Sequence, residues 1–195
     1  QLLEEASYIE VEVLDSASGY HDPSICALGG LKLIEYTADS ISGREIEIPE
    51  IQKQVFENRL LFFYSGKHHK SKPSLDLLNT QMDSALDTLH GIKKVAYDLE
   101  ESLLTGNLQR VGELIQEQQR LKQTLPGKFN DEYVENLIER INNLGAYAQL
   151  PGGKIGAFVI VYCREDNQNK IRSQLSDMQE VKLKFSYEGT QAVSL

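Results

Sequence analysis

Two short, uninterrupted apolar runs that lie far apart in the chain constrain its fold most. They are LLFFY at residues 60–64 and AFVIVYC at residues 157–163. Neither run alternates with polar residues, which is the pattern of strands that are covered on both faces. A chain with two such strands needs a sheet that other elements shelter, and the residues between the runs must supply much of that shelter.

The residues between the two runs are mostly helical in pattern. Apolar spacing of the helical kind stops at TGN, residues 105–107, where Gly106 is a natural helix end. A second helix then ends at Pro126-Gly127, and Asn130 or Asp131 caps a third. We interpret the apolar stripes of these helices as core; they contain Ile92, Val95, Ala96, Leu99, Leu103, Leu108, Val111, Ile115, Val134, Leu137, Ile138, Ile141 and Leu144.

The end of the chain returns to sheet. Residues 145–156 form a glycine-rich loop before the second apolar run, and residues 167–179 have the pattern of a short amphipathic helix. Residues 181–189 then alternate, which predicts a strand with Val181, Leu183, Phe185 and Tyr187 facing inward. The order strand, helices, strand, helix, strand predicts an α+β layer fold with helices on one face of a sheet.

The first part of the chain has a different pattern. Residues 2–14 predict a helix, residues 15–23 a loop, and residues 25–27 a short helix that Gly29-Gly30 ends. Residues 31–37 and 45–48 predict a hairpin. The polar residues 49–57 carry the expected boundary, so we expect one domain at residues 1–54 and another at residues 55–195.

Charge and composition exclude several classes of function. The net charge of −9 argues against a nucleic-acid-binding surface, because phosphate binding needs clustered positive charge. No apolar run approaches the roughly 20 residues that span a bilayer, and no signal-peptide pattern is present. Cys26 and Cys163 read as buried thiols in a reducing compartment, so we expect a cytoplasmic protein without a metal site.

Three stretches, taken in order, resemble the carboxyl-terminal part of a GHMP kinase, the family of galactokinase, homoserine kinase, mevalonate kinase and phosphomevalonate kinase. They are ASYIEVEVL with GYHDPSICALGGLKLIEY (6–14 and 19–36), NRLLFFYSGKHHKS (58–71), and GAYAQLPGGKIGAFVIVY with FSYEGTQAV (145–162 and 185–193). Within that family the chain is most similar to sugar kinases of the D-glycero-D-manno-heptose 7-phosphate kinase type. The resemblance implies a GHMP kinase-like fold whose ferredoxin-like carboxyl-terminal domain has extra helices on one face of an antiparallel sheet. It also implies that residues 1–54 are the trailing part of an amino-terminal domain.

The resemblance assigns a role to Asp22. This residue falls on the aspartate of the family's G-x-x-D motif, which acts as a base or an electrostatic anchor for the substrate hydroxyl. Phosphoryl transfer needs an aligned nucleophilic oxygen that loses its proton as the new bond forms. The alternative from the residues alone is that Asp22 caps a short helix beside Pro23. Tyr20 and His21 are the neighbouring candidates for contact with the sugar.

Two glycine loops complete the expected site. Gly66 lies in the Ser-Gly turn after the first apolar run, where the resemblance implies a substrate contact. Gly152, Gly153 and Gly156 lie in the last glycine-rich loop, where it implies nucleotide contact. Lys154 and Ile155 stand where the family usually has glycines, and they fit a close phosphate approach less well because only glycine leaves room and accepts a positive φ.

The family's phosphate-binding loop, resembling G-L-G-S-S at the start of a helix, is absent from this sequence. The chain also begins without Met, inside a helical pattern. We therefore expect a carboxyl-terminal fragment of an ATP-dependent sugar or sugar-phosphate kinase, whose ATP and Mg²⁺ bind mainly to a missing amino-terminal segment and which is inactive alone. The alternative is an inactive kinase-like domain that binds a sugar phosphate or a protein partner. The unpaired first part also predicts self-association.

Overall fold

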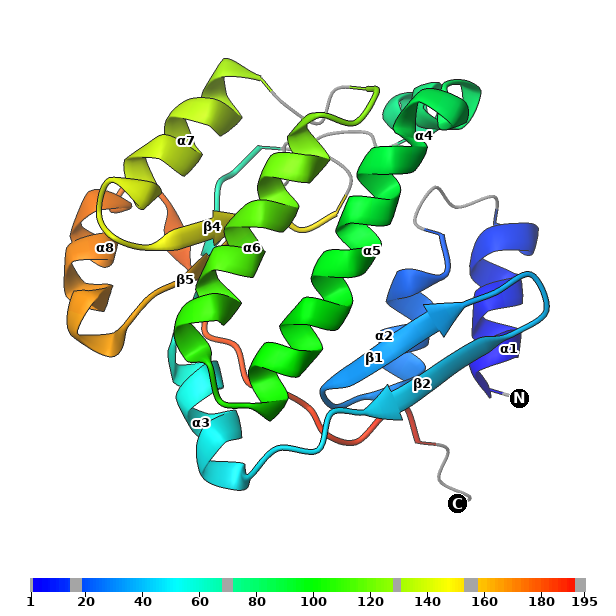
Figure 1. Ribbon diagram of the computed structural model, residues 1–195, viewed down its shortest axis with the longest axis horizontal. Helices are drawn as coiled ribbons and strands as arrows, with labels where there is room; N and C mark the ends of the chain where they lie inside the picture. The colour runs from blue at the N-terminus through cyan, green and yellow to red at the C-terminus, as the bar shows by residue number, and fades with distance from the viewer. Residues whose placement is uncertain (1, 15–18, 68–71, 128–130, 153–157, 192–195) are drawn as a thin grey trace. The chain divides into compact units, whose positions relative to one another are not determined.

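The computed structural model describes residues 2–14, 19–67, 72–127, 131–152 and 158–191. The chain divides into two compact units. Unit 1 comprises residues 1–47 together with residues 184–195, and unit 2 comprises residues 48–183. Figure 1 shows the elements of both units as ribbons. The identity of residues 1–54 as the trailing part of an amino-terminal domain stays a prediction.

Unit 2 is built on a four-stranded antiparallel sheet. Its strands are β3 (Leu60–Tyr64), β4 (Tyr147–Gln149), β5 (Phe158–Tyr162) and β6 (Gln179–Glu180). They lie in the order β4-β5-β3-β6, so the first and third strands of the unit are the central pair. With helices between β3 and β4 and between β5 and β6, this is the ferredoxin-like order. The predicted α+β fold is confirmed.

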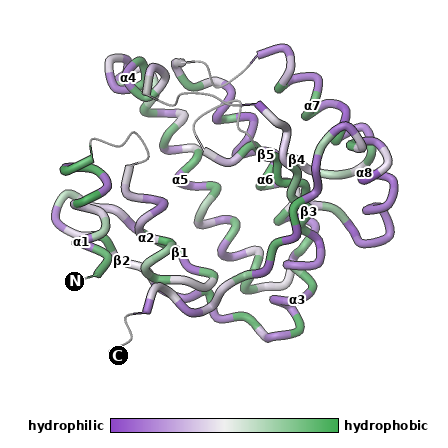
Figure 2. The backbone as a smooth tube through the Cα atoms, turned by 180° about the vertical axis from the view of Figure 1, so that it is seen from behind, coloured by the Kyte–Doolittle hydropathy of each residue, from purple (hydrophilic) through white to green (hydrophobic). Residues whose placement is uncertain are grey.

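The helices next to the predicted breaks at residues 105–107 and 126–131 end and begin close to where the sequence places them. They are α3 (Glu50–Asn58), α4 (Lys72–Thr80), α5 (Met82–Leu104), α6 (Leu108–Gln123), α7 (Glu132–Asn142), the 3₁₀ turn η2 (Glu165–Asn167) and α8 (Gln168–Gln174). Gly106 follows α5 with φ +72°. Asp131 caps α7 by accepting the Val134 N–H at 2.8 Å, as predicted. Figure 2 shows polar and apolar residues alternating along α5.

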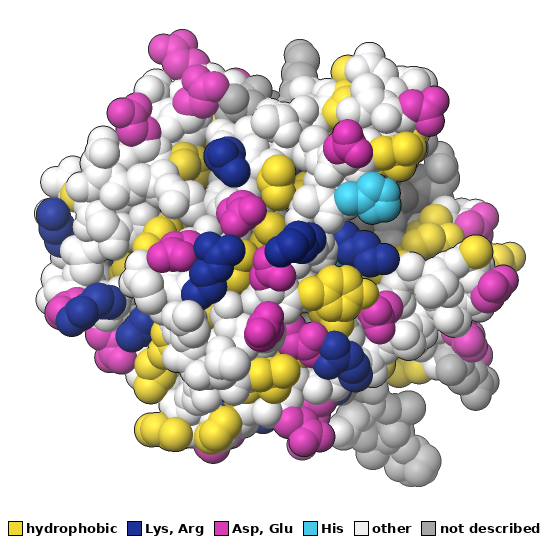
Figure 3. All heavy atoms as spheres, viewed as in Figure 1, with side chains coloured by type: hydrophobic (Ala, Val, Ile, Leu, Met, Phe, Trp, Pro, Cys, Tyr) yellow, Lys and Arg dark blue, Asp and Glu magenta, His cyan; other side chains and the backbone are white. Residues whose placement is uncertain are grey.

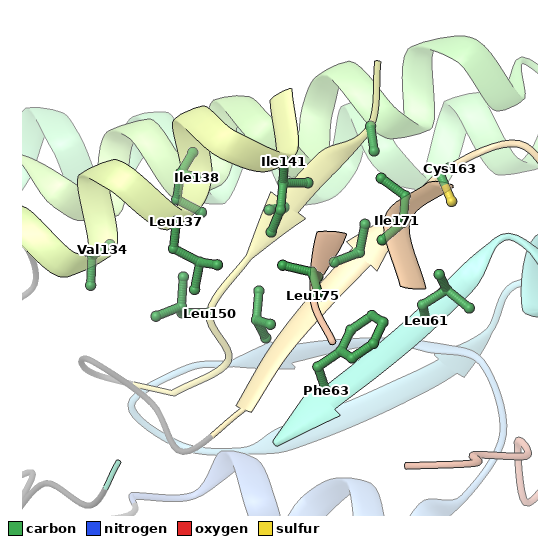
Figure 4. Packing of buried hydrophobic residues seen from close by; sticks show 14 residues of the cluster. Leu61, Phe63, Val134, Leu137, Ile138, Ile141, Leu150, Cys163, Ile171 and Leu175 are labelled. Carbon is green, nitrogen blue, oxygen red and sulfur yellow. The ribbon is translucent and has the colours of Figure 1, made fainter. Parts of the chain in front are cut away.

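Helices α7 and α8 close one face of the sheet. The apolar side chains of this face point toward them and form the main core of the unit (Figure 4). Burial at this core supplies the main favourable term in the folding of the unit. The core contains Leu61, Phe63, Val134, Leu137, Ile138, Ile141, Ala146, Ala148, Leu150, Val159, Val161, Cys163, Ile171 and Leu175.

Helix α6 contacts tyrosines of the other face. The Tyr162 hydroxyl donates to the Leu108 carbonyl at 2.9 Å, which ties β5 to the start of α6. Gly112 lets α6 approach the ring of Tyr147, because a Cβ at this position would overlap that ring. Both faces of β3 are therefore covered to some extent: Leu61 and Phe63 are buried, and the residues that alternate with them are half-buried.

Unit 1 contains two helices and a hairpin. Helix α1 (Leu2–Tyr8) continues into a π-helical segment η1 (Ile9–Val13), and α2 (His21–Leu28) precedes the antiparallel strands β1 (Lys32–Tyr36) and β2 (Ile41–Glu45). Residues 184–191 return to this unit. Thr190 donates both its N–H and its hydroxyl to the Cys26 carbonyl, each at 3.0 Å.

Several expected elements differ in the structure. The return strand of the hairpin begins at Ile41, inside the segment expected to turn, and β4 lies inside the expected glycine-rich loop. Helix α2 begins at His21 instead of Ile25, and residues 50–58 are helical. Cys26 is exposed, so the expectation that both thiols are buried is wrong for this residue.

The predicted strand at residues 181–189 is also wrong. Only Gln179–Glu180 pair as β6, and the Leu183 side chain is 59% exposed. The chain leaves the sheet after the Val181 N–H donates to the Phe62 carbonyl at 2.8 Å. Its later backbone groups bond to unit 1, where the Gly30 N–H donates to the Ser186 carbonyl at 2.7 Å. Tertiary hydrogen bonds therefore override the alternating pattern.

Candidate functional site

The predicted catalytic aspartate lies in the first turn of α2. Its Oδ1 atom is 3.0 Å from Nδ1 of His21, and both side chains are about three-quarters exposed (73% and 74%). Tyr20 immediately precedes the helix. Tyr20, His21 and Asp22 therefore form one exposed cluster at the amino end of α2, where backbone N–H groups favour negative charge.

The start of α2 is fixed by a residue other than Asp22. Ser24 is fully buried, and both its N–H and its hydroxyl donate to the Tyr20 carbonyl. Within the described residues, the Asp22 carboxylate bonds to the His21 imidazole and to no N–H group of the helix. The structure therefore does not use the carboxylate as a helix cap, and it leaves this group accessible to a ligand.

The carboxyl end of α2 is held by the last described residues of the chain. Gly29 ends the helix with φ +60°, and a Cβ there would overlap the backbone at Glu188 and Gly189. Gly29, the first residue of the Gly-Gly pair after α2, is thus needed for a close backbone approach. Together with the Thr190–Cys26 hydrogen bonds, this approach fixes the helix that carries Asp22.

Two of the predicted glycines lie at one end of the sheet of unit 2. Because β3 and β4 both run antiparallel to β5, the chain leaves each of them at the end where β5 begins. Gly66 follows β3 with φ +73°, and Gly152 follows β4 with φ +76°. Among the described residues, no atom lies within 4 Å of a Cβ built at either position. Both are open turns that leave room for a ligand near the backbone.

A lysine and a tyrosine lie beside Gly66. The Lys67 ammonium is 3.3 Å from the centroid of the Tyr133 ring, a cation–π contact between the β3 loop and α7. Ser65 hydrogen-bonds to Tyr133, and its Oγ accepts the Lys67 N–H at 3.2 Å. Burial, more than any other influence, raises the pKa of Tyr133, so its hydroxyl stays protonated at neutral pH. This end of the sheet presents a cation and hydroxyl groups, which suit an anionic ligand.

The segment that leads to Gly152 is anchored on α6. The Leu150 N–H donates to Oε1 of Gln119 at 3.0 Å, and the Lys122 ammonium donates to the Leu150 carbonyl. Gln149 donates to Gln118 at 2.7 Å. Burial lowers the pKa of Lys122 from 10.5 to about 8. Both backbone groups of Leu150 are therefore fixed two residues before the glycine.

The predicted site residues that the structure describes lie in two groups, one in each unit. Tyr20, His21 and Asp22 belong to unit 1, whereas Gly66 and Gly152 belong to unit 2. Gly153 and Gly156 lie outside the described residues, as do Lys154 and Ile155. In the described part of the chain, no group of three His, Cys, Asp or Glu side chains could hold a metal ion.

Sequence reasoning missed Tyr133, Gln119 and Lys122. Tyr133 is the second residue of α7, and no local pattern indicates that it meets the loop after β3. Gln119 interrupts the buried stripe of α6 and is only 1% exposed. A glutamine at an apolar position of a helix was the available signal, because a buried carboxamide needs specific partners.

Comparison with known protein families matches one part of the chain. Residues 99–180 match the family described as GHMP kinases C terminal. No curated protein matches the chain. None of the helices in the described ranges has the length and apolar character that crossing a bilayer requires.

Solved structures match over most of the chain. A D-glycero-D-manno-heptose 1-phosphate kinase from Bacteriodes thetaiotaomicron has a TM-score of 0.72 at 16% identity, over 98% of this chain and 55% of that one. A mevalonate kinase from L. major in complex with R-mevalonate has a TM-score of 0.65 at 17% identity, over 83% and 48%. A galactokinase from Lactococcus lactis complexed with galactose has 0.65 at 13%, over 89% and 53%. These identities show the fold alone, and the chain spans about half the length of these structures.

Proposed function

We propose that this chain, whose residues 99–180 match the family GHMP kinases C terminal, is part of an ATP-dependent sugar or sugar-phosphate kinase. The observation that carries the proposal is the match of 98% of the chain to the fold of a heptose 1-phosphate kinase. In the proposed reaction, the γ-phosphate of ATP passes to a hydroxyl of the sugar.

Asp22 is the proposed base or electrostatic anchor for that hydroxyl. Its carboxylate is exposed in the first turn of α2 and is not used as a cap, which supports this role. A carboxylate there can orient the hydroxyl and accept its proton as the phosphorus–oxygen bond forms. His21 bonds to Oδ1, so the second carboxylate oxygen remains for the acceptor.

The nucleotide and its Mg²⁺ are proposed to bind mainly through a segment outside this chain. Mg²⁺ would neutralise charge on the transferring phosphoryl group. Of the residues here, Gly152 fits a phosphate contact because its backbone is open and has a positive φ. Lys67, beside Gly66, supplies a cation for an anionic substrate group.

The catalytic assignment is tested by Asp22→Asn in a protein that joins this chain to a triphosphate-binding segment. We expect turnover to fall by about 10²–10⁴-fold, because loss of a general base typically costs that much. ATP affinity and melting temperature should change little. Asp39→Asn, at another aspartate of unit 1, is the matched control. Near-normal turnover in Asp22→Asn would remove the assignment, since this substitution keeps the shape of the side chain and removes its charge and basicity.

The nucleotide assignment is tested by calorimetry of residues 1–195 with MgATP. We expect no micromolar binding, because the chain lacks a glycine-rich phosphate loop at a helix start. Binding in that range would place the nucleotide site within these residues.

The alternative, an inactive kinase-like domain, is favoured by Lys154 and Ile155 in the last glycine-rich loop. If the joined protein binds a sugar phosphate but transfers no phosphate from MgATP, this alternative replaces the proposed activity.

A further inference from the structure

A polar groove lies between α6 and α7 in unit 2, away from both groups described above. It has a volume of about 530 Å³, which is within the range of roughly 300–1,000 Å³ typical of small-molecule sites. Its walls are mainly carboxamide and charged side chains with one apolar contribution. They comprise Glu113, Gln116, Glu117, Gln119, Arg120 and Gln123 from α6, and Ile138 and Asn142 from α7.

Two of the residues that line this groove each have a buried side-chain atom that lacks a hydrogen-bond partner within the described residues. These atoms are Nε2 of Gln119, a donor, and Oδ1 of Asn142, an acceptor. The Gln119 side chain is 1% exposed, and its Oε1 atom is held by the Leu150 N–H. The amide end is therefore the free end. A buried donor or acceptor without a partner is destabilising, so a partner for each is favoured.

A single water does not account for the groove. One water occupies about 30 Å³, a small part of the space. The two unpaired atoms come from different helices and need opposite partners, since one donates and the other accepts. A hydroxyl can both donate and accept, so a molecule with several hydroxyls is the chemical match.

The charges of the groove favour a neutral ligand. Glu113 and Glu117 contribute two negative charges and Arg120 one positive charge. Arg110 offsets the carboxylates, since its guanidinium lies 3.2 Å from Glu113 and 3.6 Å from Glu117. Figure 3 shows the same interspersion of acidic and basic side chains over the visible face of the molecule. An isolated phosphate would therefore find no concentrated positive charge in the groove.

We propose that the groove between α6 and α7 binds a neutral, monosaccharide-sized polyol through Gln119 and Asn142. The same Gln119 side chain holds the Leu150 N–H, and Leu150 precedes Gly152 by two residues. A ligand bonded to Nε2 thus acts directly on the anchor of that segment. This site does not depend on the proposed kinase activity.

The test is a titration of the ¹⁵N-labelled chain with D-galactose, followed by NMR. We expect saturable shifts of the side-chain NH₂ groups of Gln119 and Asn142, together with the Leu150 backbone amide. D-Galactose 6-phosphate should bind no more tightly. Absence of saturable shifts at these groups overturns the proposal, and tighter binding of the phosphate overturns the neutral class.

Two variants give the test its specificity. Gln116→Trp places a bulky side chain at a lining residue other than Gln119 and Asn142, and we expect it to abolish the shifts. Gln174→Trp makes the same change on an exposed position of α8 and should behave as the unaltered chain. Asn142→Leu removes the acceptor and should weaken binding by about threefold to tenfold, as expected for one hydrogen bond. Binding that is unchanged in both Gln116→Trp and Asn142→Leu, with a native-like spectrum, contradicts the assignment.

Discussion

Unit 2 and unit 1 differ in how much apolar surface each buries. Unit 2 has a continuous core between its sheet and α7 and α8, and many of its side chains there are fully buried. Among the described residues of unit 1, Leu33 and Ile46 are the apolar side chains counted as buried core. Several large apolar side chains of α1 and η1 are exposed instead, namely Leu2, Tyr8, Ile9 and Val13.

This difference has a physical consequence for each unit. A ferredoxin-like layer closed by helices satisfies the main requirement for independent stability, which is burial of a contiguous apolar area. A two-stranded hairpin is marginal by itself and needs further strands or a helix against its apolar face. The exposed side chains of α1 and η1 are consistent with the proposal that another segment belongs against unit 1. The self-association expected from the sequence stays a prediction.

The largest expected effect separates the two units by stability. Ile141→Ala removes a fully buried side chain from the core of unit 2 and should lower the unfolding free energy by about 2–5 kcal/mol. Ile9→Ala makes the same change at a side chain that is 51% exposed in unit 1 and should cost far less. Urea titrations of both variants measure the contrast. Equal losses would show that η1 is as well packed as α7.

The core of unit 2 was predictable because local and tertiary preferences agree there. Residues 60–64 and 158–162 form strands as predicted, and Asp131 caps α7 where the sequence places a cap. In unit 1 and the terminal segment these preferences conflict. The alternating residues 181–189 have the pattern of a strand, but Ser186 and Thr190 bond to Gly30 and Cys26 instead. Such distant partners leave no periodic signal.

Some features of the candidate site were predictable from the sequence and others were not. The Gly66 and Gly152 turns follow from glycine between apolar runs, and both have the positive φ that only glycine adopts easily. The contact of Lys67 with Tyr133 joins a loop to a helix far along the chain. The unpaired Nε2 of Gln119 depends on the register of α6 against α7. Neither of these two features could be predicted from the spacing of residues in the sequence alone.

The next largest effect compares a glycine from each unit. Gly189→Ala would place a Cβ against the Ala27 carbonyl, and backbone yields poorly, so we expect a loss of about 1–3 kcal/mol in unit 1. Gly91→Ala in α5 places a Cβ 3.3 Å from the flexible end of Leu121. It should be neutral or stabilising, because alanine is favoured over glycine in helices by roughly 1 kcal/mol.

Hydrogen exchange, measured at individual amides, tests the comparison of Gly189→Ala with Gly91→Ala. Gly189→Ala should reduce the protection of amides in α2 and β1 while leaving α7 and β5 unchanged. A uniform loss across both units would show that the chain unfolds as one cooperative body, which removes the basis for treating the units separately.

The smallest expected effect concerns ion pairs. In unit 2, Arg172 contacts both carboxylate oxygens of Glu180 at 2.9 Å and joins α8 to β6. The hydrogen bonds from Arg172 lower the pKa of Glu180 below its ordinary value. Because the folded-state pKa is lowered, the pair stabilises the fold above the unfolded pKa of about 4.3, and this stabilisation is lost as pH falls through the folded pKa.

Glu180→Gln should therefore cost about 1 kcal/mol at neutral pH and almost nothing in strong acid. In unit 1, the Lys32 ammonium lies 3.9 Å from the carboxylate of Glu45, whose side chain is 46% exposed, so Glu45→Gln should change stability by less than about 0.5 kcal/mol. Urea titrations of both variants at neutral and acid pH measure this difference. A cost for Glu180→Gln that persists in acid would show that packing of the side chain, and not its charge, holds α8 to β6.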